Sequence, residues 1–284
     1  MKKSGMVAII GRSNVGKSTL INTLVGTKVA ITTPKPQTTR KPIQGIITRE
    51  QGQVVFVDTP GIMQKARDTL TNKLNAHAKD SLRGVNAILY IVDPTRPIGD
   101  EEKQAFRLVE HQTIPKLLVI NKIDDKASKN FIDYYRDLGA KFDAYVEVSA
   151  LTSKNTDLIE KWIWENMPEG EALYPEFQLT SMGNEEWLAE LIREKLFLRL
   201  REEVPYSTHV EVHSIDIQDN GTVFVDATIY THSERYKPMI IGAGGRGIKE
   251  IGQSTRRELE AVTGKKYFLQ LQVAVDPRWV ERME

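Results

Sequence analysis

The sequence contains no cysteine, which excludes disulfide bridges and thiolate metal sites and is typical of a reducing compartment. It has no apolar run long enough to span a bilayer, and residues 1–5 lack the apolar core of a secretory signal. Neither sign of charge is in excess, since 39 basic and 38 acidic side chains leave a net charge of +1. We therefore expect a cytoplasmic protein, with peripheral contact at the inner face of the cell membrane left open. Any nucleic-acid site must be a local patch.

The length of the chain, 284 residues, is sufficient for two domains with separate cores. Between the two halves, Pro168, Gly170, Pro175 and a polar run to Gly183 indicate a linker. The predicted parts are a first domain, a linker and a second domain, at residues 1–168, 169–184 and 185–284.

A glycine-rich segment at residues 11–18 has the P-loop pattern G-x-x-x-x-G-K-S. An apolar, β-prone run precedes it and a short helix is expected after it, which is the context that the motif requires. Glycines let successive backbone N–H groups point inward at phosphate oxygens, and the helix N-terminus adds a favourable field. Lys17 can reach the outer phosphates, and the Ser18 hydroxyl can bind Mg²⁺. The residues predicted to hold the nucleotide here are Gly11, Asn14, Val15, Gly16, Lys17, Ser18 and Thr19.

A second strand-like run, 53–57, ends in the tetrapeptide Asp58-Thr59-Pro60-Gly61. A carboxylate at the end of a strand beside the P-loop can hold Mg²⁺ through water, and the Gly61 N–H can contact the terminal phosphate. The tetrapeptide could also be an ordinary turn. Its position after the P-loop favours a catalytic role for Asp58 and Gly61 together with Lys17.

A third buried-strand run is followed by Asn121-Lys122-Ile123-Asp124. The Asp124 carboxylate can accept two hydrogen bonds from guanine N1–H and N2–H₂, whereas adenine lacks that donor pair and would leave a polar group unpaired. Asn121 is expected to bond to the base and tie the loops together, while the Lys122 stem covers the ring.

A fourth run ends in Ser149-Ala150-Leu151, whose backbone can contact guanine O6. All four motifs follow strand-like runs, and open α/β sheets bind ligands at the carboxyl ends of their strands. The ordered set therefore predicts one guanine-nucleotide site.

These motifs resemble the G domain of translation-factor-class GTPases, and residues 31–40 resemble the first switch of the Era family of bacterial GTPases. The resemblance implies an α/β, Ras-like P-loop G domain with a mostly parallel sheet, and hydrolysis of GTP. In that family a threonine of the switch binds Mg²⁺ and senses the terminal phosphate. Matching the Thr-Arg pair assigns this role to Thr39, with Thr38 as the alternative. The implied metal ligands are Ser18, Thr39 and Asp58.

Ile62 stands where Ras-like enzymes carry a glutamine that orients water. Because its side chain cannot hydrogen-bond, we expect slow intrinsic hydrolysis unless another group positions the water. Asn14 is a candidate, because members of the wider family with asparagine here are thought to use K⁺ against the phosphates. Equally, Asn14 could bond only within its loop, and the usual proline before it is replaced by Ser13.

The second half of the chain alternates between helical and strand-like periodicity. The charged residues of its first helix are expected to form a solvated face. The elements follow in the order helix, strand, strand, short helix, glycine-rich loop, helix and strand, at 185–201, 210–217, 223–230, 236–241, 242–245, 246–262 and 267–273.

This order resembles a type II KH domain, an α+β fold whose GxxG loop lets a nucleic-acid backbone approach a helix N-terminus. Single-stranded bases then lie between helix and strand. The family usually has a lysine in the loop, but this chain has Ala243, so weaker binding with a shallower salt dependence is expected. The residues implied in RNA binding are Gly242, Ala243, Gly244, Gly245, Arg246 and Lys249.

The resemblance covers nearly the whole chain and implies a monomeric GTPase that binds the 3′ end of 16S rRNA and acts in assembly of the small (30S) ribosomal subunit. GTP and Mg²⁺ are the implied ligands, with K⁺ as a further candidate. One alternative is a GTP-gated RNA-binding chaperone with negligible turnover, which Ile62 favours. Another is an assembly GTPase that docks on protein or membrane and uses the KH fold as a scaffold. A P-loop ATPase or kinase fits least well.

Overall fold

The computed structural model describes residues 2–33, 43–58 and 82–279, and the chain forms two compact units whose boundary falls at Ser181 and Met182. The switch residues assigned from the sequence, Thr38, Thr39, Gly61 and Ile62, lie outside the described residues. Within the described ranges, no helix has the length and apolar character needed to cross a bilayer.

The first unit is built on a six-stranded sheet in the order β2-β3-β1-β4-β5-β6. Among the described strands of this sheet, β2 alone runs antiparallel to its neighbour. The predicted α/β fold with a mostly parallel sheet is therefore confirmed. The strands are β1 (Lys3–Ile10), β2 (Ile43–Arg49), β3 (Gly52–Asp58), β4 (Ala87–Val92), β5 (Lys116–Ile120) and β6 (Ala144–Glu147).

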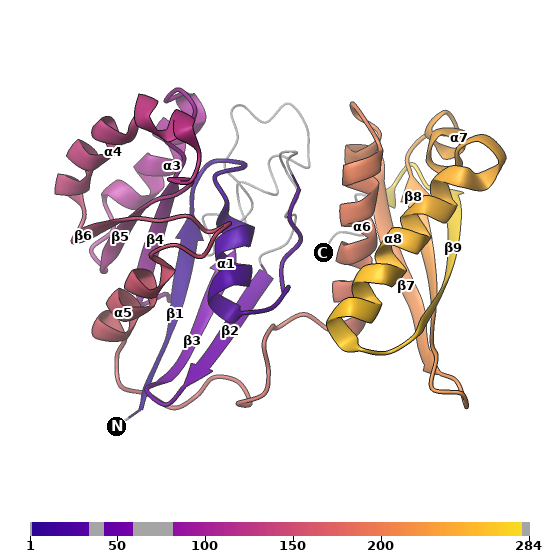
Figure 1. Ribbon diagram of the computed structural model, residues 1–284, viewed down its shortest axis with the longest axis horizontal. Helices are drawn as coiled ribbons and strands as arrows, with labels where there is room; N and C mark the ends of the chain where they lie inside the picture. Colours follow the sequence, from indigo (N-terminus) through magenta and orange to yellow (C-terminus); the bar gives the residue numbers. More distant parts are fainter. Residues whose placement is uncertain (1, 34–42, 59–81, 280–284) are drawn as a thin grey trace. The chain divides into compact units, whose positions relative to one another are not determined.

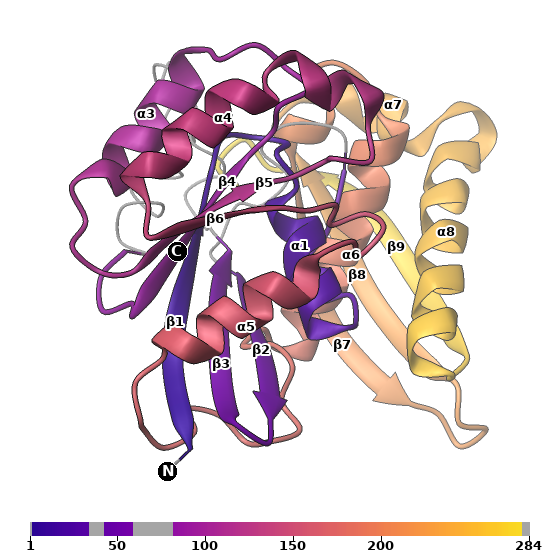
Figure 2. The ribbon, with the colours of Figure 1, turned by 60° about the vertical axis from the view of Figure 1, so that its left-hand side comes forward.

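Helices cover both faces of this sheet (Figure 2). Helices α1 (Lys17–Val25) and α5 (Thr156–Asn166) pack in one hydrophobic cluster, and α3 (Asp100–Glu110) and α4 (Ile132–Leu138) pack in the other. Strands buried on both faces need continuous apolar runs, which is why Ile9 and Ile10 are both fully buried in different clusters. The parallel strands β1, β3 and β5 thus bring their carboxyl ends, and the motifs that follow them, to one edge.

The segment after α5 is hydrogen-bonded to β3 and to the edge strand β2. The side-chain amide of Gln53 both donates to the Tyr174 carbonyl and accepts from the Tyr174 N–H, each at 2.8 Å. Further along, the Ile46 N–H donates to the Leu179 carbonyl oxygen at 2.9 Å. Residues up to Ser181, which the sequence suggests as linker, therefore lie along β2 and belong to the first unit.

The second unit has a three-stranded sheet in the order β7-β8-β9, with β7 antiparallel and β9 parallel to β8. Helices α6 and α8 lie on one face of it (Figure 1). The order of elements is the one predicted for an α+β KH fold. The elements are α6 (Asn184–Arg199), β7 (Thr208–Ile217), β8 (Val223–Thr231), α7 (Tyr236–Ile241), α8 (Arg246–Thr263) and β9 (Tyr267–Val275).

The prediction that the charged residues of α6 form a solvated face is wrong for Arg193, Glu194 and Lys195, which are buried. Helix α6 packs against both β7 and α8, which cover it from more than one side. Lys195 pairs with Glu194, at 3.0 Å, and with Glu258, and Arg193 pairs with Glu190.

Candidate functional site

The P-loop turns sharply between β1 and α1, and two of its glycines have no room for a side chain. A Cβ on Gly11 would lie 2.4 Å from the Ile91 carbonyl oxygen, and one on Gly16 would lie 2.3 Å from Asn121 Nδ2. Gly16 also has φ 102°, which favours glycine. The sequence pattern is therefore matched by a backbone that requires glycine at both ends of the motif.

Lys17 and Ser18 begin α1 at the edge where Asp58 ends β3. The Lys17 ammonium donates to the carbonyl oxygens of Gly11, at 3.1 Å, and Arg12, at 3.0 Å. Burial lowers the pKa of Lys17, and the nearby Asp58 carboxylate opposes that change. The Ser18 hydroxyl donates to Asp58 Oδ2 at 2.7 Å. A cation and two oxygen ligands thus converge at a helix N-terminus, which favours a phosphate with a hard metal ion.

Asn121 joins the P-loop to the loop after β6. Its Nδ2 donates to the Val15 carbonyl at 2.8 Å, and its Oδ1 accepts from the Ala150 N–H at 2.9 Å. Asp124 lies exposed three residues further on, while Ser149 is buried and Leu151 is exposed. Asn121 therefore ties Ala150 to the P-loop, while the base-binding roles of Asp124 and Leu151 stay predictions.

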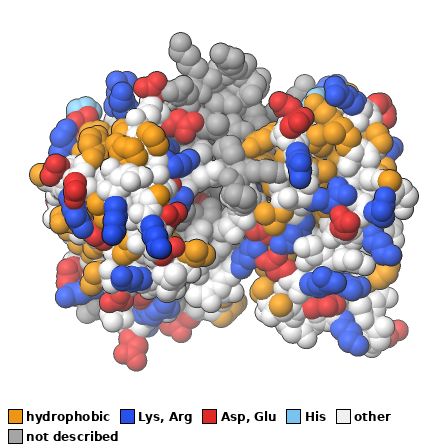
Figure 3. Space-filling model, turned by 45° about the horizontal axis from the view of Figure 1, so that its top comes forward, with side chains coloured by type: hydrophobic (Ala, Val, Ile, Leu, Met, Phe, Trp, Pro, Cys, Tyr) orange, Lys and Arg blue, Asp and Glu red, His pale blue; other side chains and the backbone are white. Residues whose placement is uncertain are grey.

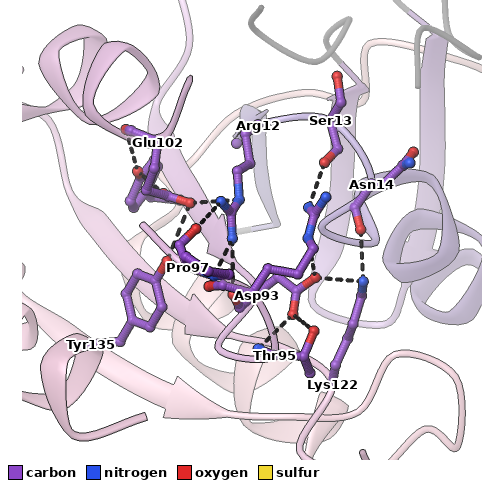
Figure 4. A network of polar contacts seen from close by, with 12 residues as sticks. Arg12, Ser13, Asn14, Asp93, Thr95, Pro97, Glu102, Lys122 and Tyr135 are labelled. Atoms are coloured by element: carbon purple, nitrogen blue, oxygen red, sulfur yellow. Dashed lines mark hydrogen bonds and ion pairs between the residues drawn. The ribbon is translucent and has the colours of Figure 1, made fainter. Parts of the chain in front are cut away.

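Lys122 is held by Asp93, a residue that the sequence analysis does not identify (Figure 4). Lys122 Nζ lies 2.6 Å from Asp93 Oδ2 and donates to the Asn14 carbonyl at 2.8 Å. Although burial acts to raise it, hydrogen bonds from Lys122 and Thr95 hold the pKa of Asp93 below its ordinary value. A buried, ionised carboxylate therefore connects Lys122 with the P-loop backbone.

Two arginines cross between the P-loop and residues 93–97 (Figure 4). Arg96 donates from Nη2 to the Ser13 carbonyl at 2.8 Å, and Arg12 donates from Nη1 to the Pro97 carbonyl at 2.8 Å. Residues 93–97 therefore brace the P-loop from the side. The sequence does contain a signal for these residues. Asp93 directly follows an apolar run, which is β4, and the carboxyl end of β4 lies at the same edge of the sheet as the P-loop.

We expect Asp93→Asn to speed the dissociation of bound guanine nucleotide about tenfold, because it removes the anionic partner of Lys122. In the wild-type protein Asp93 Oδ1 accepts from the Thr95 N–H at 2.9 Å. The asparagine Oδ1 can accept the same bond, so the local turn is kept. Stopped-flow release of a fluorescent GDP analogue measures the rate. Asp133→Asn, which removes a carboxylate that is 84% exposed, is the control. Equal release rates in the two variants would contradict this role.

The loop before α8 has the geometry that a close backbone approach needs. Gly242, Gly244 and Gly245 have φ of 73°, 60° and 75°, and a Cβ on Gly242 would lie 2.8 Å from the Gly247 nitrogen. Helix α8 starts after this loop without a side-chain cap and without an acidic residue in its first turn. Its first N–H groups therefore form a site that favours an anion.

A groove of about 330 Å³ lies between α8 and β9 beside this loop. Lys249 and Arg256 contribute its charged side chains. On the face of the molecule drawn in Figure 3, Lys and Arg are interspersed with Asp and Glu. The sequence predicts Lys249 here but not the amide side chain of Gln253. The lining residues are Ile248, Lys249, Gly252, Gln253, Arg256, Phe268, Leu269 and Leu271.

Two known family models match this chain, one in the first unit and one in the second. Residues 6–122 match the model of a family described as 50S ribosome-binding GTPase. Residues 203–280 match the KH domain model. The two matches cover the P-loop with Asn121 in the first unit and the glycine loop with its groove in the second.

Similar proteins extend over the full chain. GTPase Era of Halothermothrix orenii is 40% identical over 99% of this chain and 95% of its own, and that of Caldanaerobacter subterraneus is 41% identical over 98% and 94%. A crystal structure of Era with MgGDPNP and nucleotides 1506–1542 of 16S ribosomal RNA has a TM-score of 0.92 at 37% identity, covering 100% of this chain and 97% of that one. Aquifex aeolicus Era bound to GDP and aluminium fluoride has a TM-score of 0.91 at 37% identity, covering 99% and 96%. The chain therefore belongs to the Era family of GTPases, enzymes that hydrolyse GTP.

Proposed function

We propose that this GTPase binds the 3′ end of 16S rRNA through its KH domain and acts in assembly of the small ribosomal subunit. The observation that carries the proposal is the uncapped N-terminus of α8 behind three glycines with positive φ, next to a groove with Lys249 and Arg256. Such a site accepts a phosphate backbone while unpaired bases enter the groove. The related Era structure with a 16S rRNA fragment supports the same assignment.

The nucleotide site fits Mg²⁺ by its donor set. The Ser18 hydroxyl and the Asp58 carboxylate supply hard oxygen ligands 2.7 Å apart, and the predicted third ligand, Thr39, lies outside the described residues. Mg²⁺ held by these residues would supply positive charge beside the phosphates and so offset the charge that develops during hydrolysis. Lys17, held at the same point by P-loop carbonyls, is the residue that we assign to the terminal phosphates.

Membership of a GTPase family favours hydrolysis over the alternative of a nucleotide-gated RNA binder without turnover. The group that orients water stays a prediction, since Ile62 and Gly61 lie outside the described residues. Asn14 is the candidate for a K⁺-dependent role, and Lys122 fixes its carbonyl at 2.8 Å. Comparing phosphate release in K⁺ and Na⁺ buffers tests this K⁺-dependent role.

Contacts with a membrane and the monomeric state also stay predictions. Vesicle flotation tests the first and sedimentation tests the second.

The proposed function predicts that an RNA oligonucleotide with the 3′-terminal sequence of 16S rRNA binds more tightly than a scrambled one of equal length. Fluorescence anisotropy with a GTP analogue present measures both affinities, and we expect a difference of about tenfold or more. Gly244→Asp, which puts a carboxylate into the glycine loop, should weaken both complexes by repelling the phosphates. Equal affinity for the two oligonucleotides would overturn recognition of this rRNA.

A further inference from the structure

Ser13 is a P-loop residue with a buried hydroxyl that takes no part in the contacts between this loop and its neighbours. It stands where the family usually has proline, and it is only 6% exposed. Among the residues that the structure describes, its Oγ has no hydrogen-bond partner. A buried hydroxyl that has given up its bonds to water without replacing them is unfavourable. Inside a ligand-binding loop, such a group indicates that the ligand supplies the missing bond.

The backbone around this hydroxyl is fixed. Arg96 Nη2 donates to the Ser13 carbonyl at 2.8 Å, and Lys122 Nζ donates to the next carbonyl, that of Asn14, at 2.8 Å. In Figure 4 the Ser13 carbonyl points towards Arg96, whereas the hydroxyl points away from this network. Because the backbone is held, rotation about the bonds of a short side chain is the freedom that remains, and the hydroxyl is a preorganised donor.

The position of Ser13 in the loop places it near the outer phosphates of a nucleotide. Backbone N–H groups of a P-loop bind the inner phosphates, whereas the lysine reaches the outer ones. Lys17 Nζ donates to the carbonyl oxygens of Gly11, at 3.1 Å, and Arg12, at 3.0 Å. The Arg12 carbonyl belongs to the peptide bond that joins Arg12 to Ser13. The start of the loop, with Ser13, therefore lies beside the ammonium that binds the outer phosphates.

We propose that the Ser13 hydroxyl donates a hydrogen bond to the terminal phosphate of GTP and so helps the protein to discriminate GTP from GDP. The inference rests on the proposed assignment of Lys17 to the terminal phosphates. GDP lacks the acceptor, so the bond is made with the triphosphate alone. We expect Ser13→Ala to lower the affinity for the GTP analogue GDPNP about tenfold, because a hydrogen bond to a charged group is lost. The affinity for GDP should stay as in wild type.

Competition with a fluorescent GDP analogue, in Mg²⁺ buffer and with the full-length protein, measures the Kd values of GDPNP and GDP. Their ratio is the readout, because a change in loop shape lowers both affinities together. Ser4→Ala is the matched control. Ser4 is 8% exposed, and its hydroxyl also lacks a partner within the described part of the chain, but it lies at the opposite end of β1 from the P-loop. This control should keep the wild-type ratio.

Lys17→Ala separates the contact of Ser13 from the phosphate site itself. It should weaken the binding of both nucleotides, because Lys17 also reaches a phosphate that GDP retains. If Ser13→Ala keeps the wild-type ratio, the contact with the terminal phosphate is wrong while the assignment of Lys17 stands. If Lys17→Ala binds both nucleotides as tightly as wild type, the phosphate site and the contact are both overturned. A loss of preference for GDPNP in Ser13→Ala, with Ser4→Ala unchanged, supports the proposal.

Discussion

Asp124→Asn is expected to change the preference of this enzyme from guanine to xanthine nucleotides and to lower its affinity for GTP about a thousandfold or more. Guanine presents two N–H donors to the Asp124 carboxylate, whereas an asparagine amide would place its own donor against one of them. Xanthine has an oxygen at that position and accepts from the amide. The surrounding loop is fixed independently, because Asn121 is bonded to both Val15 and Ala150.

Competition between fluorescent GTP and XTP analogues measures this change. Asp125→Asn is a matched control on the next residue, since the side chain at that position accepts from the Ala127 N–H and an asparagine oxygen can do the same. The control should keep its preference for GTP. Tight binding of GTP by Asp124→Asn, or equal affinity of the wild-type protein for ATP and GTP, would show that this carboxylate does not select the base.

Glu102→Ala is expected to lower the free energy of unfolding of the first unit by about 3–5 kcal/mol. Glu102 is buried on α3 and lies 3.0 Å from Arg12, which is buried as well. It also accepts hydrogen bonds from the hydroxyls of Tyr90 and Tyr135, whose pKa values are raised by burial, so both stay neutral donors. The truncation would leave a buried guanidinium without its counter-charge.

Urea denaturation of the full chain, followed by a probe in the first unit, measures this loss. Glu110→Ala on the same helix is the control, because its pairing with Lys141 at 3.4 Å is exposed and should contribute less than about 1 kcal/mol. Glu102→Ala should also weaken nucleotide binding, since Arg12 carries one of the carbonyls that hold Lys17. If the two variants are equally stable, the buried ion pair between Glu102 and Arg12 is not a main contributor to the stability of the first unit.

The sequence was sufficient to predict the arrangement of the nucleotide motifs because strand periodicity and parallel order place them at one edge. Asp58, Asn121 and the P-loop come together for that reason alone. Glu102 could not be identified in this way. It stands in an acidic run, Asp100-Glu101-Glu102, that is typical of an exposed helix start, and it is buried because Arg12, from a distant part of the chain, lies against it.

The sheet of the second unit shows the same limit. Alternation correctly predicts that residues 267–273 form a strand, but periodicity does not say which strand is at the edge or what stacks on its exposed face. The stacking of Phe268 on Phe224 follows only from the pairing of β9 with β8, which brings the two rings together on the sheet face away from α6 and α8. Likewise, the buried charges of α6 follow from packing on more than one side of that helix, which a single-helix pattern does not contain.

The attachment of Tyr174 to β3 and of Leu179 to β2 has a practical consequence for dissecting this protein. A fragment cut at Met167 would uncover the backbone hydrogen-bonding groups of that edge strand and the buried amide of Gln53. Bare strand edges recruit other strands, and such a fragment would self-associate into aggregates. A truncated catalytic fragment should instead extend through Ser181, which keeps the edge covered by its own chain.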